Sequence, residues 1–218
     1  MIHLTKKPQP QVLIDNNQKW KTEYMHCIET GEKPKKSLAT AYAHPTIKKA
    51  LLEETYNKCA YCESKIGSVS FGDIEHILPK SERPDLCFEW SNLTLACEKC
   101  NRAGKRTYYS EDYPLSNPYV DYPEECLIAA GAYIYPYQGH ERAEITINTI
   151  KLNRVRLLEE RKERMDFLSN LIEKWASYSP EHPLKAIAEE NLHLYYESEA
   201  KYSFIIKQFL KLQGFPVR

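Results

Sequence analysis

Two short cysteine motifs limit what this chain can fold into more than any other feature. Cys59 and Cys62 form the first CxxC pair, and Cys97 and Cys100 form the second, with 34 residues (63–96) between the pairs. A CxxC turn presents two sulfurs to one ion, and two such turns supply the four thiolates of a tetrahedral structural zinc site. Because the separation exceeds the roughly 15–20 residues of a compact zinc ribbon, a further structural element is expected between the two turns.

The other cysteines show no such pairing. The chain has seven cysteines, and an odd number does not fit a closed disulfide framework. Cys27, Cys87 and Cys126 stand alone in the sequence and are expected to be reduced thiols. Two alternatives to zinc stay open for the paired cysteines: a cluster of reduced core thiols, or a redox role for one CxxC motif. Two such motifs in one small unit favour a metal.

The charge balance excludes one mode of nucleic-acid binding. The 218 residues include 30 Lys and Arg and 30 Asp and Glu, so the formal net charge at pH 7 is zero. Proteins that bind nucleic acid through bulk positive charge depend on many basic residues that displace counterions. Any nucleic-acid binding by this chain is therefore expected to be local, or shared with another protein.

Composition and hydropathy indicate a globular protein of one or two domains. Apolar residues make up 42% of the chain and charged residues 28%, which are ordinary values for globular proteins. No apolar run approaches the roughly 18 residues of a membrane span, and the first residues lack the apolar core of a signal peptide. The chain is expected to be cytoplasmic, with no membrane partner.

A short run between the CxxC pairs carries side chains suited to hydrolysis. The letters FGDIEHILPK read as a short strand that contains Asp73, Glu75 and His76. Alternation along a strand places the two carboxylates on one face and His76 on the other, unless the chain bends there. Histidine takes up a proton near neutral pH, and carboxylate and Asn oxygens suit magnesium or manganese. These groups fit metal-assisted attack of water on a phosphodiester, although a Glu-His pair also occurs in surface strands without catalytic function.

The order of the motifs adds to this interpretation. In sequence order the unit reads CAYC, GDIEHILPKS and WSNLTLACEKCNRAGK, and it resembles the HNH family of endonucleases in its zinc-stapled form. That family has a ββα-metal finger, in which a hairpin is followed by a helix. The resemblance implies strands at 73–76 and 92–96 and a helix at 98–106. The expected fold is mainly α with this small finger inserted between N-terminal and C-terminal helices, an α+β class.

The same resemblance implies roles for individual residues. His76 is the expected general base, and Glu75 and Asn101 are the expected ligands of a catalytic Mg²⁺ or Mn²⁺, with Asp73 as a competing ligand. Asn92 is expected to hold the long loop of the finger, and Cys59, Cys62, Cys97 and Cys100 to bind the structural zinc. The alternatives are a structural histidine, a helix cap at Asn101 and a turn role for Asp73. As a base, His76 must be neutral, so activity is expected to fall below about pH 6–6.5.

Four basic residues lie close together in the expected finger helix. They are Lys99, Arg102, Lys105 and Arg106. These side chains are expected to contact phosphates next to the scissile bond. The alternative is a solvated helix face with no ligand.

The resemblance extends beyond the finger. The stretches LLEETYNKCAYCE, YPLSNP and AEITINTIKLNRVRLLEERKER are similar to the PtuB-like nuclease component of Septu-type and related retron-associated antiphage systems, over roughly residues 1–165. This implies cleavage of DNA in complex with an ABC/SMC-like (PtuA-like) ATPase, with a retron RNA/DNA element as a further candidate partner. Two other functions stay open: a zinc-structured binding module without catalysis, and a stand-alone restriction-like HNH endonuclease.

The segments around the finger are expected to differ in character. Residues 1–58 read as helices, 107–142 as a Tyr/Pro-rich irregular connector with one short strand at 132–135, and 143–218 as a helical region that contacts a partner. Eight tyrosines between 108 and 137 are expected either to pack between finger and helices or to stack on bases. The candidate anchors for a partner, which could equally pack the helices together, are Leu168, Ile172, Trp175, Leu194, Tyr195 and Tyr202.

Overall fold

A computed structural model describes residues 1–67 and 71–217. Its helices are α1 Gln11–Thr30, α2 Lys36–Ala39, α3 Pro45–Glu54, α4 Glu98–Cys100, α5 Pro123–Cys126, α6 Glu141–Ile150, α7 Val155–Ser177, α8 Pro183–His193 and α9 Ser203–Leu212. Its strands are β1 Asp73–His76, β2 Leu93–Ala96, β3 Leu127–Ala130 and β4 Tyr133–Pro136. Short 3₁₀ segments lie at Ala41–Ala43, Pro84–Leu86, Trp90–Asn92 and Tyr137–Gly139.

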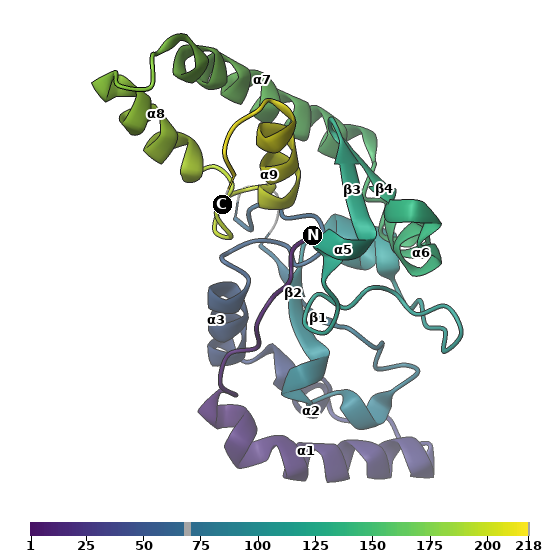
Figure 1. The fold of residues 1–218 in the computed structure, drawn as a ribbon. Coiled ribbons are helices and arrows are strands. Elements are labelled where there is room, and N and C mark those ends of the chain that lie inside the picture. Colours follow the sequence, from purple (N-terminus) through teal and green to yellow (C-terminus); the bar gives the residue numbers. More distant parts are fainter. Residues whose placement is uncertain (68–70, 218) are drawn as a thin grey trace.

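Two small antiparallel sheets among many helices confirm the expected α+β class. The strands pair as β1 with β2 and β3 with β4. In Figure 1 the β1–β2 pair lies in the middle of the molecule, with α1 on one side of it and α7, α8 and α9 on the other. No helix within the described ranges combines the length and the apolar character needed to cross a membrane.

The N-terminal helices form where the sequence predicts them. Helix α1 follows Pro10 and ends at Gly31, whose φ of 72° favours glycine. Leu13 and Tyr24 are buried on its inner face, but Ile28 is 45% exposed, so the apolar stripe ends earlier than the sequence pattern indicates. Helix α3 begins at Pro45 as expected.

Helix α3 supports the back of the hairpin. The side chain of His44 accepts a hydrogen bond from the Thr46 amide and so caps the helix. Ile47 and Leu51 are fully buried, and they share a core cluster with Leu93 of β2. This packing fixes the hairpin against the N-terminal helices.

The hairpin matches the prediction, but the helix after it does not. Strand β1 spans Asp73–His76 as expected, and it pairs with β2 so that Asp73 faces Ala96 and His76 faces Leu93. The predicted helix over 98–106 is one α turn followed by a wider π turn at Asn101–Lys105. This turn packs closely on α6, because a Cβ at Gly104 would lie 2.9 Å from the Ile150 carbonyl oxygen.

The connector is more regular than the sequence indicates. One strand was expected at 132–135, and the structure has a hairpin of β3 and β4 instead. Leu127 and Ala129 are buried on one face of β3, and Ile134 is buried on β4. Alternate burial of this kind stabilises a two-stranded sheet against the core, so the description of 107–142 as irregular is corrected for this part.

A break divides the helix that the sequence predicts after residue 143. Lys151 has a φ of 59° and ends α6, and α7 begins at Val155. The buried guanidinium of Arg161 donates to the Leu152 carbonyl at 2.8 Å and to the Ala132 carbonyl at 3.1 Å. The first bond satisfies a carbonyl group at the break, and the second joins α7 to the turn between β3 and β4. Helical periodicity does not reveal such tertiary contacts.

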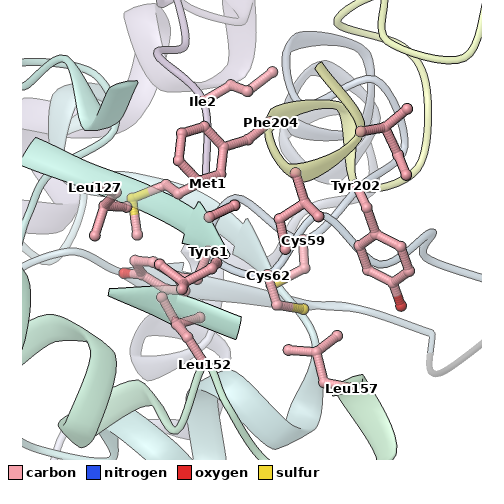
Figure 2. Packing of buried hydrophobic residues seen from close by; sticks show 14 of the residues in the cluster. Met1, Ile2, Cys59, Tyr61, Cys62, Leu127, Leu152, Leu157, Tyr202 and Phe204 are labelled. Carbon is pink, nitrogen blue, oxygen red and sulfur yellow. The ribbon is translucent and has the colours of Figure 1, made fainter. Parts of the chain in front are cut away.

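The main core surrounds the CxxC turns. In Figure 2, Tyr61 and Leu152 lie on one side of Cys59 and Cys62, and Phe204 of α9 lies on another. The four cysteines therefore pack in the same cluster as residues from both ends of the chain.

The main core contains three of the six residues that were candidate anchors for a partner. Leu168, Ile172 and Tyr202 are buried within the chain, so the structure corrects their assignment to a partner surface. Leu194 is 65% exposed and remains accessible to a partner.

Candidate active site

The four paired cysteines converge on one point. Their sulfur atoms all lie within 4.8 Å of one another, and Cys62 Sγ is 3.8 Å from Cys97 Sγ. A tetrahedral zinc site with Zn–S bonds of about 2.3 Å has S···S separations of about 3.8 Å. Cys59 and Cys100 are fully buried, which suits a closed structural site rather than a redox motif that must meet a partner.

A guanidinium group lies against the sulfur cluster. Arg154, just before α7, donates from Nη1 to Cys100 Sγ at 3.6 Å. Burial alone would lower the pKa of Arg154, but the charges of Cys100 and Cys62 raise it above its ordinary value. Hydrogen bonds from Cys100 and Cys59 hold the pKa of the Cys62 thiol well below its ordinary value. The pKa of the Cys97 thiol is lowered in the same way, whereas burial raises the pKa of Cys59 and hydrogen bonds within the cluster raise that of Cys100. Thiolate, the form that binds metal, is therefore favoured at Cys62 and Cys97.

The contact between Arg154 and the cluster predicts weaker metal retention when it is removed. We expect Arg154→Met to lower the zinc affinity about tenfold, because outer partners of metal ligands contribute about 10–100-fold. Competition with a colorimetric chelator measures this change. Arg156→Met is the matched control, since Arg156 is exposed and pairs with Glu160. Equal zinc release from both variants would contradict the role of Arg154.

Asp73 is engaged at the surface of the finger. Its carboxylate accepts two hydrogen bonds from Arg102, at 2.9 and 2.8 Å, and one from Asn101 Nδ2 at 3.3 Å. The Asn101 side chain therefore turns its nitrogen toward Asp73 and its oxygen away from it. This arrangement leaves the Asn101 oxygen for another ligand and occupies both oxygens of Asp73.

Glu75 holds a buried cation. Lys105 Nζ lies 2.6 Å from Glu75 Oε1 and also donates to the His76 carbonyl oxygen at 2.9 Å. Both side chains are almost fully buried. Burial raises the pKa of Glu75, and the charge of Lys105 opposes that shift. The Glu75 carboxylate thus already stabilises one positive charge, that of the Lys105 ammonium group.

The His76 ring is fixed by a backbone carbonyl. His76 Nε2 lies 2.9 Å from the Cys87 carbonyl oxygen. The Tyr42 ring packs edge to face on the imidazole, with 4.6 Å between the ring centroids. A carbonyl oxygen only accepts hydrogen bonds, so Nε2 carries the proton and Nδ1 keeps its lone pair. Burial lowers the pKa of His76 to about 4, against the hydrogen bond to Cys87, with Lys80 and Lys105 adding to the shift. The imidazole ring therefore stays neutral at pH values below 6–6.5, where the sequence alone predicts a fall in activity.

One pocket of about 260 Å³ joins these groups, and we call it the active-site pocket. Its lining includes Glu75, His76, Lys80, Asn101, Lys105 and Arg106. Strand alternation places Glu75 and His76 on opposite faces, yet both line this pocket at the end of β1. Asp73 is not part of its lining, which favours Glu75 over Asp73 as the acidic ligand.

Asn92 connects the two ends of the loop between the strands. Its Oδ1 accepts from the Leu78 amide at 2.7 Å, and its Nδ2 donates to the carbonyl oxygens of Leu78 and Leu86 at 3.0 and 3.2 Å. These three hydrogen bonds join the buried Asn92 amide to backbone groups of the loop. The geometry suits the loop-holding role that the resemblance implies.

Comparison with known families settles what the finger is. The family model for HNH endonucleases matches residues 59–106, from the first CxxC cysteine to the residue directly after the π turn.

The chain carries an HNH domain.

Relatives of the chain carry the names Septu protein PtuB and retron Vc95. It is 32% identical to the Septu protein PtuB of Bacillus thuringiensis over 157 residues, which are 71% of this chain and 56% of that protein. It is 30% identical to the Septu protein PtuB of Bacillus mycoides (strain KBAB4), over 56% of this chain and 51% of that protein. A Vibrio cholerae protein named for retron Vc95 and for the HNH endonucleases is 30% identical, over 50% of this chain and 58% of that protein. The chain spans about half the length of these relatives and is homologous to the PtuB proteins.

The basic residues of the HNH domain do not form one group. Lys99, Arg102 and Arg106 are exposed, whereas Lys105 is 2% exposed and bound to Glu75. The expectation that Lys105 contacts phosphate at the surface is therefore corrected, because its ammonium group is committed to a buried ion pair. The three exposed side chains remain proposed phosphate contacts.

Three groups around His76 are not identified by sequence reasoning. Tyr42 and the Cys87 carbonyl hold the His76 ring, and Lys80 lines the same pocket. Lys80 belongs to the GDIEHILPKS sequence that contains His76, so a sequence signal for Lys80 was present. Tyr42 comes from outside the domain, and a backbone carbonyl has no sequence signature.

Proposed function

We propose that this chain is a metal-dependent endonuclease that cleaves DNA phosphodiester bonds in antiphage defence. One observation supports this above the others: a neutral, oriented His76 shares a pocket with Glu75 and Asn101 inside an HNH domain. A general base needs a free lone pair at working pH and a fixed orientation. Both requirements fit the His76 geometry.

In the proposed mechanism His76 acts through Nδ1. The Cys87 carbonyl keeps the proton on Nε2, so Nδ1 accepts a proton from the attacking water. The low pKa keeps this nitrogen unprotonated across the neutral range. The exposed side chains of Lys99, Arg102 and Arg106 bind neighbouring phosphates and fix the strand.

The donor set of the pocket fits a hard divalent cation. Glu75 and the Asn101 carbonyl oxygen would hold Mg²⁺ or Mn²⁺, which prefers oxygen ligands and often takes only one or two carboxylates with substrate phosphates. When bound, such an ion stabilises the charge that develops on the phosphate and on the leaving oxygen. Lys105 remains beside Glu75 and limits the net negative charge of the buried site.

We further propose a complex with an ABC/SMC-like (PtuA-like) ATPase in the cytoplasm. The homology to PtuB proteins and the zero net charge support it, because a neutral chain gains affinity for DNA from a partner. We propose zinc as the ion of the four-cysteine cluster, and a retron RNA/DNA element as a candidate component of the same system.

Cleavage of plasmid DNA tests the nuclease function. The purified chain, alone and with the product of the neighbouring gene, is incubated with plasmid in magnesium or manganese, with and without ATP. We expect nicked or linear products only when a divalent ion is present. The absence of cleavage in every condition, from protein that retains its zinc, would contradict the proposal.

Two other outcomes correspond to different functions. The buried pair between Lys105 and Glu75 favours a zinc-structured binding module, since a neutralised carboxylate does not need a metal. Binding of DNA without cleavage would support that module. Full activity without the ATPase would support a stand-alone restriction-like enzyme.

A further inference from the structure

A second pocket adjoins the active-site pocket. It has a volume of about 300 Å³, and two short chain segments contribute residues to the linings of both pockets. Ile77 and Leu78 line it, directly after His76, and Tyr108 and Tyr109 line it, directly after the residues at 105–107 that line the active-site pocket. Consecutive Cα atoms are about 3.8 Å apart, so the two pockets share walls. We call the second one the tyrosine pocket.

The tyrosine pocket differs from its neighbour in charge. Among the described residues that line it, Arg142 alone carries a charge, and its guanidinium is already bound to Asp121 and to the Leu115 carbonyl. The remaining lining is aromatic, aliphatic, hydroxyl or amide. The lining of the active-site pocket instead includes the basic side chains of Lys80 and Arg106, beside the buried pair of Lys105 and Glu75. One pocket therefore suits phosphate, and the other suits an uncharged planar group with polar edges.

The two tyrosine rings are held in place. The Tyr108 hydroxyl donates to the Tyr113 carbonyl at 2.9 Å, and the Tyr109 hydroxyl donates to Glu111 at 3.0 Å. Both residues are half-buried. Anchored rings lose little conformational freedom on binding, and aromatic faces stack on nucleobases with about 1–3 kcal/mol per base.

We propose that the tyrosine pocket binds an unpaired nucleobase of the strand whose phosphate lies in the active-site pocket. The inference rests on the proposed nuclease function and specifies its substrate: a single strand, or a duplex with a base out of the stack. A paired base is covered on its edge and both faces, so it does not enter a pocket of this kind. The exposed Ser91 in its lining is available to the edge of the base.

The test measures binding rather than cleavage. His76→Gln protein, in magnesium, is titrated by fluorescence anisotropy into a labelled oligothymidylate and into a strand of the same length that carries abasic sugar phosphates. We expect the strand with bases to bind about tenfold tighter. A labelled DNA duplex and an oligouridylate are further arms, and they separate unpaired DNA from paired DNA and from RNA.

Variants locate the effect in the tyrosine pocket. We expect Tyr109→Leu and Ser91→Trp each to remove most of the preference for bases, by loss of a ring and by obstruction, and Tyr109→Phe to retain it. Tyr133→Leu is the matched control, because Tyr133 is an exposed tyrosine on β4 away from this pocket. Melting temperature and zinc content verify the fold of each variant.

The outcomes distinguish this inference from the proposed function. Equal affinity for the strands with and without bases, or an unchanged preference in both Tyr109→Leu and Ser91→Trp, would overturn the base site. Cleavage of plasmid by the wild type would then leave the nuclease function standing. A base preference that depends on Tyr109, in a protein that cleaves nothing, would retain the base site and refute the nuclease.

Discussion

Replacing His76 with glutamine is expected to reduce DNA cleavage at least about 100-fold, because general base catalysis contributes about 10²–10⁴-fold. Glutamine keeps an N–H donor for the Cys87 carbonyl, which accepts from His76 at 2.9 Å. Alanine would leave that buried carbonyl without its partner, at a cost of about 1–3 kcal/mol of folding free energy. Plasmid nicking in manganese measures the effect of His76→Gln, and thermal melting shows that the fold is intact.

A surface histidine provides the matched control for this substitution. His26 is an exposed residue of α1. It is distant from His76 in the sequence and does not line the active-site pocket. We expect His26→Gln to cleave at the wild-type rate. Wild-type cleavage by His76→Gln would refute the assignment of the base, and equal loss in both variants would point to an effect on folding.

Removal of one zinc-site thiol is expected to unfold the HNH domain. Structural zinc contributes about 10–16 kcal/mol in zinc-finger peptides, and a whole domain is stable by only about 5–15 kcal/mol. The four cysteines also lie in the main core, so their loss disturbs packing with Leu152 and Phe204. We expect Cys97→Ser to lose bound zinc and its cooperative melting transition, measured by metal analysis and circular dichroism.

The unpaired cysteines separate a metal effect from a general thiol effect. Cys27 lies half-buried on α1, away from the zinc-site sulfurs. Cys27→Ser is expected to retain one zinc per chain and wild-type melting. Cooperative unfolding of Cys97→Ser at the wild-type temperature would contradict a structural role for the metal.

Local signals were sufficient for the elements that motifs define. Strand β1 follows from the DIEH run between the cysteine pairs, and α3 follows from Pro45 at its first position. The convergence of the four cysteines follows from their spacing, because chelation by two CxxC turns requires it. In these cases a few neighbouring residues determine the geometry.

Tertiary contacts decided the features that the sequence did not reveal. At the break after α6, Arg161 binds the Leu152 carbonyl and also the Ala132 carbonyl, which lies 29 residues away in sequence, whereas the helical period continues through the break. Lys105 belongs to a basic run that is typical of a solvated face, but it turns inward to a carboxylate 30 residues away in sequence. A pattern of residue types does not show which cation of such a run finds a buried partner.

The position of the cysteines in the core also bears on the order of folding. The contact between Cys62 and Cys97 closes a sequence separation of 35 residues, whereas Lys58 reaches the Ala200 carbonyl across 142 residues. Loop closure costs more entropy for longer separations, and the distant partner is also synthesised later. Metal capture can therefore tie the finger together while the C-terminal helices are still missing. We therefore expect residues 59–106 to become ordered before α9 completes their core.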